Sequence, residues 1–312
     1  MSDATQSRSG AQTPDDSSQV TLAARAEQAG GTAAILSTLH EIRRNDTGLL
    51  RGIKTLLKVN QPEGVDCPGC AWPEAAGERN EIEFCENGAK AITWESTRRR
   101  IDAAFFARHS VAELLSESDY VLGQYGRLVE PVYLPPGGSH YQAISWDAAY
   151  RLIADELGKL SSPHEAAFYT SGRTSNEAAY LFQLLVRQLG TNNLPDCANL
   201  CHESSGVALK ETVGVGKGTV QLEDFEQADA IFILGQNPGT NHPRMMSTLQ
   251  KAAARGCEIV AVNPLPEAAL LRFAHPQNPT ELLGGGSTIT SLFLPVQIDG
   301  DAALCKGIMK EL

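Results

Sequence analysis

Residues 230–243 read AIFILGQNPGTNHP, and residues 258–264 read EIVAVNP. Both segments open with a short apolar run that is typical of a buried strand, and both close with Gly, Asn or Pro. The residues from 242 to 255 have the spacing of a helix, and Gly256 stands in the usual stop position. Two strands joined by a crossover helix pair in parallel. The sequence therefore predicts an α/β fold in which parallel-sheet layers carry helices on both faces.

The preceding segment shows the same alternation of strand and helix patterns. Residues 146–160 have helical spacing, and residues 166–170, AAFYT, predict a buried strand. Thr174 and Glu177 form a capping-box signature for a further helix, which we expect to end at Gly190.

The chain divides into three regions by composition. Residues 1–30 are polar and poor in apolar anchors, so we expect a disordered leader. Residues 31–144 should form a small metal-organised subdomain, opened by one or two helices over 32–57 that break around 45–48. Residues 145–312 should form the α/β region.

The charge and hydropathy exclude some partners. The formal net charge is −11, whereas nucleic-acid binders usually present a clustered basic face. No apolar run approaches the roughly 20 residues that a membrane helix needs, and the first 30 residues lack the apolar core of a secretion signal. We therefore expect a cytoplasmic protein that binds no nucleic acid and has no direct membrane span.

Three of the seven cysteines are clustered in the sequence. DCPGC at 66–70 places two thiols two residues apart, and FCENGAK at 84–90 adds a third. Thiolates with this spacing can bind one metal centre, because the Pro-Gly pair permits a tight turn that directs both sulfurs to one side. In a chain too long to need disulfide staples, such a group indicates metal binding. Cys67, Cys70 and Cys85 should therefore converge, either on an iron–sulfur cluster or as half of a structural zinc site.

A second cysteine motif is DCANLCHESSG at 196–206. Cys201 and His202 are adjacent there, in a polar segment. A thiolate is a soft ligand that suits a heavy transition metal, and a neighbouring imidazole can exchange a proton near pH 7. From the residues alone, the alternatives are a buried structural role for Cys197 and a Cys-His pair in a loop without any function.

The turns after the two predicted strands are candidate ligand sites, because open parallel sheets bind ligands at the carboxyl ends of their strands. Gly235 and Gly239 let the backbone approach a phosphate, and the helix that begins near His242 offers free amide groups to an anion. The dinucleotide fingerprint GxGxxG is absent, which argues against a nicotinamide-binding domain. GVGKG at 214–218 follows no convincing strand and should be a turn.

In this order, the three motifs resemble the molybdopterin oxidoreductase family, and within it the branch similar to formate dehydrogenase alpha subunits. The resemblance is carried by CPGCAWP and FCENGAK, supported by YQAISWDAAYRLIADEL, SGRTSNEAAYLFQLLVRQLGTNN and LPVQIDGDAALCKGIMK. It covers nearly everything from about Gly48 to Leu312. Members of this family are more than twice as long, so the sequence looks like the N-terminal portion of a longer chain, with a second pterin-binding domain and a substrate-orienting arginine beyond Leu312.

The resemblance implies a molybdenum enzyme with bis-molybdopterin guanine dinucleotide and an iron–sulfur cluster of the 4Fe-4S type. Cys201 would bind molybdenum, and His202 would take part in proton transfer. Lys90 would link the cluster to the pterin. The cluster ligands would be Cys67, Cys70 and Cys85. One pterin dinucleotide would lie along the two strand-end turns, held by Gly235, Asn237, His242 and Asn263.

The implied activity is the oxidation of formate or a similar small molecule, with electrons leaving through the pterin and the cluster to an acceptor that the sequence does not identify. Two features depart from the family pattern. Relatives with a four-iron cluster have another cysteine shortly after the first pair, where this sequence reads AWPEAAG with Glu74 near the expected place. Lys90 also lies five residues beyond Cys85, farther than in typical relatives. A non-cysteine fourth ligand, a three-iron form and a labile cluster therefore stay open, as does a non-catalytic metal-binding or regulatory protein that keeps the fold.

Two spatial expectations follow. The turns at Gly235 and Asn263 should lie side by side at one edge of the sheet, facing a cavity that Cys201 also faces. The remaining cysteines should pack in apolar surroundings or lie far from the cofactor; these are Cys197, Cys257 and Cys305.

Overall fold

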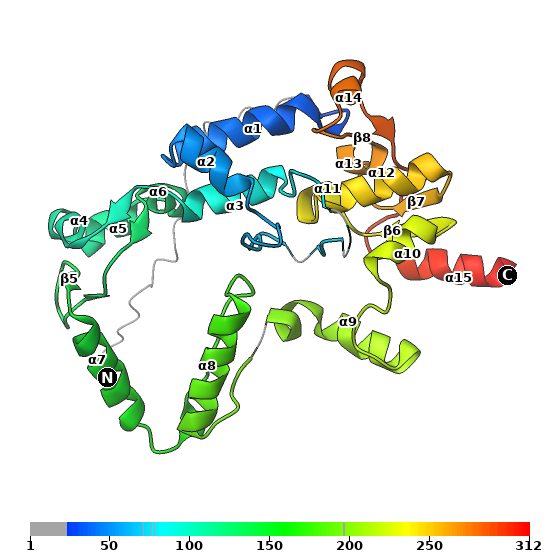
Figure 1. Cartoon of the computed structure of the whole chain (residues 1–312). Coiled ribbons are helices and arrows are strands. Elements are labelled where there is room, and N and C mark those ends of the chain that lie inside the picture. Colours follow the sequence, from blue (N-terminus) through cyan, green and yellow to red (C-terminus); the bar gives the residue numbers. More distant parts are fainter. Residues whose placement is uncertain (1–23, 71, 76, 78, 196) are drawn as a thin grey trace. The chain divides into compact units, whose positions relative to one another are not determined.

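The computed structural model describes residues 24–70, 72–75, 77, 79–195 and 197–312 (Figure 1). Residues 1–23 of the expected leader therefore lie outside the described residues. The described chain forms two compact units. The helical unit comprises Trp94–Thr170 and Ser175–Pro195, and the sheet unit comprises Ala24–Thr93, Ser171–Thr174 and Asp196–Leu312. Every candidate site residue belongs to the sheet unit, while the boundaries expected at residues 30 and 144 remain predictions.

The sheet unit contains the expected strand, helix and strand. Three parallel strands are arranged in the order β10 (Leu292–Leu294), β7 (Glu258–Val262) and β6 (Ala230–Leu234). The crossover helix is α12 (Met245–Arg255), and Gly256 ends it in the left-handed conformation that glycine adopts readily. In Figure 1, α12 lies alongside these strands. The mixed α/β architecture is thus confirmed.

The core of the sheet unit lies on one face of this sheet. Met246 and Leu249 of α12 pack there against Ile233 and Ile259, and all four side chains are buried. On the opposite face, three large apolar side chains remain exposed: Phe232 (60%), Leu292 (49%) and Leu234 (45%). A helical layer on that second face remains a prediction.

A smaller helical core positions the first cysteines. It is formed by α1 (Gly31–Arg44), α2 (Leu49–Leu56) and α3 (Glu86–Glu95). Its buried side chains are Ile42, Leu56, Val59, Ala89 and Ile92, and Cys67 and Phe84 pack against them. The two expected helices and the break between them are confirmed.

The other elements of the sheet unit are short. A second sheet has the order β1 (Ala29–Gly30), β8 (Arg272–Ala274) and β9 (Ser287–Thr288). The remaining helices are α9 (Cys197–Val213), α10 (Leu222–Gln227), α11 (Pro238–Asn241), α13 (Ala268–Leu271), α14 (Pro279–Gly284) and α15 (Asp301–Glu311).

The helical unit is built from five α-helices, a short 3-10 helix and two strand pairs in its described part. The helices are α4 (Ala103–Arg108), α5 (Val111–Ser116), α6 (Asp119–Gln124), α7 (Trp146–Gly158) and α8 (Asn176–Leu189), and the 3-10 helix is Pro163–Glu165. β2 (Arg100–Ile101) pairs with β3 (Arg127–Leu128) in parallel, and β4 (Val132–Tyr133) pairs with β5 (Gln142–Ala143) in antiparallel fashion.

Two local expectations for the helical unit were wrong. The cap of α8 is Ser175, whose hydroxyl accepts from the Ala178 amide, rather than Thr174. Residues 166–170 form no strand, because no neighbouring strand pairs with them; the Phe168 amide donates to the Asn193 carbonyl instead. Among the described residues, no helix is both long and apolar enough to cross a membrane.

Candidate metal and cofactor site

Three thiols line one cavity of about 200 Å³ in the sheet unit. Cys67 and Cys70 lie in the loop between α2 and α3, and Cys85 directly precedes α3. The three cysteines thus lie around one cavity, as expected. No three His, Cys, Asp or Glu side chains of the described residues form a group that could hold a single metal ion, so the role of these cysteines as metal ligands stays a prediction. The remaining lining residues include Asn60, Gly69, Glu74, Phe84, Asn87, Gly88, Thr240, Asn241, Pro243 and Arg244.

Gly88 makes room for the sulfurs. It is buried in the first turns of α3, and a Cβ atom there would lie 3.1 Å from Cys67 Sγ and 3.7 Å from Cys85 Sγ. Both sulfurs therefore lie close to one point on the backbone of α3. A side chain at position 88 would occupy the space that the thiols share.

Backbone amides and burial set the protonation of the thiols. The Gly69 amide donates to Cys67 Sγ at 3.4 Å, and the Gly88 amide donates to Cys85 Sγ at 3.3 Å. Burial nevertheless raises the pKa of both Cys67 and Cys85, and these amides offset the rise only in part. Both thiols are therefore protonated at neutral pH.

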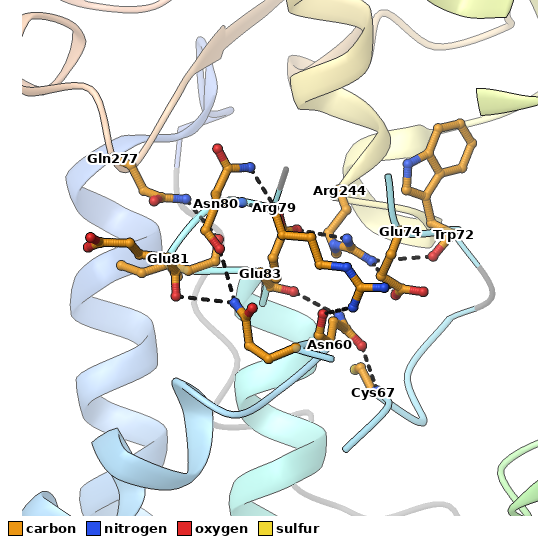
Figure 2. A network of polar contacts seen from close by, with 12 residues as sticks. Asn60, Cys67, Trp72, Glu74, Arg79, Asn80, Glu81, Glu83, Arg244 and Gln277 are labelled. Carbon is orange, nitrogen blue, oxygen red and sulfur yellow. Dashed lines mark hydrogen bonds and ion pairs between the residues drawn. The ribbon is translucent and has the colours of Figure 1, made fainter. Parts of the chain in front are cut away.

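Asn60 organises the backbone around the first cysteine. Its Oδ1 accepts from the Cys67 amide at 2.8 Å, and its Nδ2 donates to the Glu83 carbonyl at 2.8 Å. Arg79 Nη1 donates to the Asn60 carbonyl at 2.5 Å, and Asn60 itself has a φ of 57°, a conformation that asparagine tolerates better than most residues. Figure 2 shows these contacts beside Cys67. Asn60 thus ties the start of the cysteine loop to the segment that leads into Cys85.

Arg244 joins the same segments from the other side of the cavity. Its Nη1 donates to Glu74 Oε1 at 2.9 Å and to the Trp72 carbonyl at 3.3 Å, while its Nη2 donates to Glu83 Oε2 at 2.8 Å (Figure 2). Glu74, which stands near the place of the missing cysteine, therefore lines the cavity but forms an ion pair with Arg244.

The two strand-end turns lie side by side, as expected. Leu234 is in register with Val262, and the Gly235 amide continues the ladder by donating to the Val262 carbonyl at 2.9 Å. Gly235 has a φ of 63°, so the chain turns away from the strand there. Asn263 directly follows Val262, and its side chain donates to the Leu265 carbonyl at 2.6 Å.

The turn after β6 contains an unsatisfied polar atom. Asn237 Oδ1 is buried and has no hydrogen-bond partner in the described part of the chain. His242 Nδ1 lies 3.4 Å from Gln236 Nε2, and the His242 ring packs edge-on against Trp72. Contacts of these residues with a cofactor remain predictions, as does a cavity in front of the turn that Cys201 also faces.

Asn87 connects the cysteine cavity to this turn. Its Nδ2 donates to the carbonyl of Thr240 in α11 at 2.7 Å. Lys90 lies one turn farther along α3, where it is exposed and is not among the residues that line the thiol cavity. The role expected of Lys90 stays a prediction, whereas Asn87 makes a contact between the two halves of the site.

Cys201 lies apart from the thiol cavity. It is exposed on α9, which is broken at His202 by non-helical angles (φ −130°, ψ 17°). Cys257 is buried in the core of the sheet, as expected, and Cys305 is exposed on α15. The side chain of Cys197 lies outside the described residues.

Sequence reasoning missed four residues of this site. They are Asn60, Asn87, Gly88 and Arg244. Asn87 could have been noticed because it follows Cys85 by two positions, and Arg244 because it ends the turn that begins at Gly235. The partners of Arg244 precede it by more than 160 positions in the sequence. No local sequence pattern indicates a contact over such a separation.

Known proteins are similar to this chain over most of its length. The molybdopterin oxidoreductase family profile matches residues 127–283. An uncharacterized oxidoreductase of Mycobacterium tuberculosis is 55% identical over 94% of this chain and 38% of its own length. Protein YdeP of Escherichia coli is 46% identical over 91% of this chain and 37% of its own length.

A more distant relative carries a named activity. The alpha subunit of F420-dependent formate dehydrogenase 2 of Methanococcus maripaludis is 35% identical over 58% of this chain and 27% of its own length. The chain thus spans less than two fifths of the length of the relatives it matches. On the strength of the family profile, which covers half of its residues, the chain belongs to the molybdopterin oxidoreductase family.

Proposed function

We propose that the protein oxidises formate or a similar small molecule at a molybdenum centre and passes the electrons through an iron–sulfur cluster. Cys201 would bind molybdenum and His202 would exchange the proton. The cluster, of the 4Fe-4S type, would be held by Cys67, Cys70 and Cys85. The cofactor would be bis-molybdopterin guanine dinucleotide.

The observation that carries the proposal is the cavity shared by three thiols beside the turn that follows β6. The raised pKa values of Cys67 and Cys85 mean that a bound cation is needed to keep these sulfurs as thiolates at neutral pH. A cluster spreads its ligands over several irons, so three thiols around one cavity suit a cluster.

The turns after β6 and β7 supply the features that a pterin dinucleotide requires. Asn237 Oδ1 is a buried acceptor without a partner, and a buried acceptor of this kind is stabilised when a ligand donates to it. Gly235 lets the backbone approach a phosphate, and Asn263 stands on the neighbouring strand end. We therefore assign Gly235, Asn237, His242 and Asn263 to cofactor binding.

When bound, the molybdenum cofactor supplies two-electron redox chemistry. Formate loses two electrons and one proton to become carbon dioxide. His202 would accept the proton, because a histidine side chain can act as a general base. The backbone of α9 departs from helical angles at His202. Asn87, and Lys90 on the same helix, would lie along the route between the pterin and the cluster.

The test uses the holoenzyme purified without oxygen, with molybdenum, iron and zinc measured alongside formate-dependent dye reduction. Cys201→Ser replaces a soft ligand by a hard one and should abolish turnover while leaving the iron content unchanged. Cys305→Ser, on exposed α15, is the matched control and should behave as the wild type. Near-normal formate oxidation by molybdenum-loaded Cys201→Ser would refute the assignment.

The ion pair between Glu74 and Arg244 favours one alternative, a non-catalytic metal-binding or regulatory protein that keeps the fold. Besides the three cysteines, no other thiol lines the described cavity. A holoenzyme that contains zinc, or neither iron nor molybdenum, would support this alternative.

A further inference from the structure

We propose that Arg244 is a positioning residue for the iron–sulfur site, which holds the cysteine loop in place and compensates the negative charge around it. This inference rests on the proposed cluster at Cys67, Cys70 and Cys85. Arg244 touches none of the reacting atoms. It would act through the segments that carry the ligands.

The first argument is the geometry of its contacts. Arg244 directly precedes α12 and follows the turn assigned to the cofactor. One of its nitrogens binds the segment just after Cys70, through Trp72 and Glu74, and the other binds Glu83, two residues before Cys85. A single planar guanidinium therefore fixes both ends of the ligand set, a task that suits its rigid fork of donors.

The second argument is burial. The side chain of Arg244 is 14% exposed and that of Glu83 is 11% exposed. Charged side chains are seldom buried unless they are paired, and removing one partner leaves the other without compensation. Other ion pairs of α12 differ in this respect: Lys251 pairs with Glu226 at 3.5 Å, and both side chains are more than half exposed.

The third argument is the sign of the charge. Arg244 lines the thiol cavity and carries the positive charge that its two carboxylate partners face. Without it, Glu74 and Glu83 would present two uncompensated negative charges next to an electron-rich cluster. Negative charge opposes the uptake of an electron, so the reduction potential should fall.

Two substitutions separate the effect of the charge of Arg244 from the effect of its planar shape. Arg244→Gln removes the charge and most of the contacts, whereas Arg244→Lys keeps the charge but cannot reach both carboxylates with a planar fork. The Gln variant should lower the cluster potential, and the Lys variant should keep it close to that of the wild type. In both variants the cysteine loop should open more often.

The experiment combines two measurements on the complete protein. Electron paramagnetic resonance during a redox titration of the holoenzyme gives the cluster potential. After the metal has been removed, the rate of labelling by a thiol reagent measures loop opening, and we expect it to rise about tenfold or more in both variants, the usual effect of losing hydrogen bonds to charged groups. Lys251→Gln, on the same helix, is the control and should change neither quantity.

The outcomes distinguish this inference from the proposed function. If the wild type holds no iron, the cluster assignment fails, whereas the labelling rates still decide whether Arg244 holds the loop. If iron is present, an unchanged potential in Arg244→Gln together with wild-type labelling would overturn the inference. Should Arg244→Gln fail to fold, Glu74→Gln removes one carboxylate from the same network, and faster labelling of its thiols is then the expected result.

Discussion

Gly88→Ala is the sharpest test of the shared thiol cavity, because one methyl group would enter the space between two sulfurs. The new Cβ would lie 3.1 Å from Cys67 Sγ and 3.7 Å from Cys85 Sγ. Within a helix, alanine is more favourable than glycine by about 1 kcal/mol. Overpacking costs about 1–3 kcal/mol where neighbours cannot move. In the metal-free protein, the Cys67 side chain can rotate into the cavity, so the two effects should nearly cancel.

The cluster-loaded protein should respond differently, because a sulfur bound to iron cannot move aside. The full overpacking cost should then appear as weaker cluster binding, by about 10- to 100-fold. The assay is iron per chain after anaerobic dialysis against a chelator, with thermal melting of the metal-free protein alongside. Gly307→Ala in α15, where a Cβ would meet nothing within 4 Å, is the control and should keep its iron. Wild-type iron retention by Gly88→Ala would refute the assignment of this cavity to the cluster.

Two further predictions concern the contacts around the site. Asn87→Ala removes the hydrogen bond to the Thr240 carbonyl and should destabilise the protein by about 0.5–1.5 kcal/mol, measured by urea unfolding; an unchanged midpoint would show that the contact is absent in solution. Burial lowers the pKa of His275. For Glu281, burial alone would raise the pKa, but hydrogen bonds donated by neighbouring amide groups outweigh this effect and lower the pKa. Both groups contribute stability that is present above their unfolded pKa values of about 6.5 and 4.3 and is lost in acid, so the melting temperature should fall from pH 7 to pH 4. Glu281→Gln should flatten this fall below pH 5, and a profile identical to the wild type would contradict the prediction.

The strand and helix pattern of the sheet unit could be predicted because it is local. The apolar runs at 230–234 and 258–262 and the glycine at 256 are each sufficient to identify an element. Residues 166–170 carry a similar apolar run, yet they form no strand. A strand requires a neighbour for its backbone groups, and the sequence of one segment does not reveal whether that neighbour is present.

The cap of α8 illustrates a finer limit. Thr174 and Ser175 are both good capping residues, and the box signature pointed to Thr174 because Glu177 follows it by three positions. The backbone of Ser175 is extended, at φ −62° and ψ 153°, so the helix begins at Asn176. A difference of one residue at a helix end depends on backbone angles that the letters alone do not determine.

The candidate site also combines features that a short stretch of sequence indicates with contacts between residues that are far apart in the sequence. The convergence of Cys67, Cys70 and Cys85 could be predicted from the hypothesis that all three bind one metal centre, because the ligands of one centre have to lie close together. The residues that hold the cavity together were not predictable, since Asn87 reaches Thr240 across 153 positions and Arg244 reaches Glu74 across 170 positions. The environment of the candidate site therefore has to be learned from the fold, even where its cysteines can be recognised from the sequence.

The charge balance around Arg244 bears on the missing fourth cysteine. Glu74 stands near the place where relatives have that cysteine, but its carboxylate is bound to Arg244 at 2.9 Å. If Glu74 turned to an iron, Arg244 would keep only Glu83 and the Trp72 carbonyl as partners while remaining mostly buried. Breaking one arm of a buried ion pair is costly, and the hard carboxylate would gain little from an iron already surrounded by sulfur. If the proposed cluster is bound, the network therefore argues that Glu74 is not among its ligands.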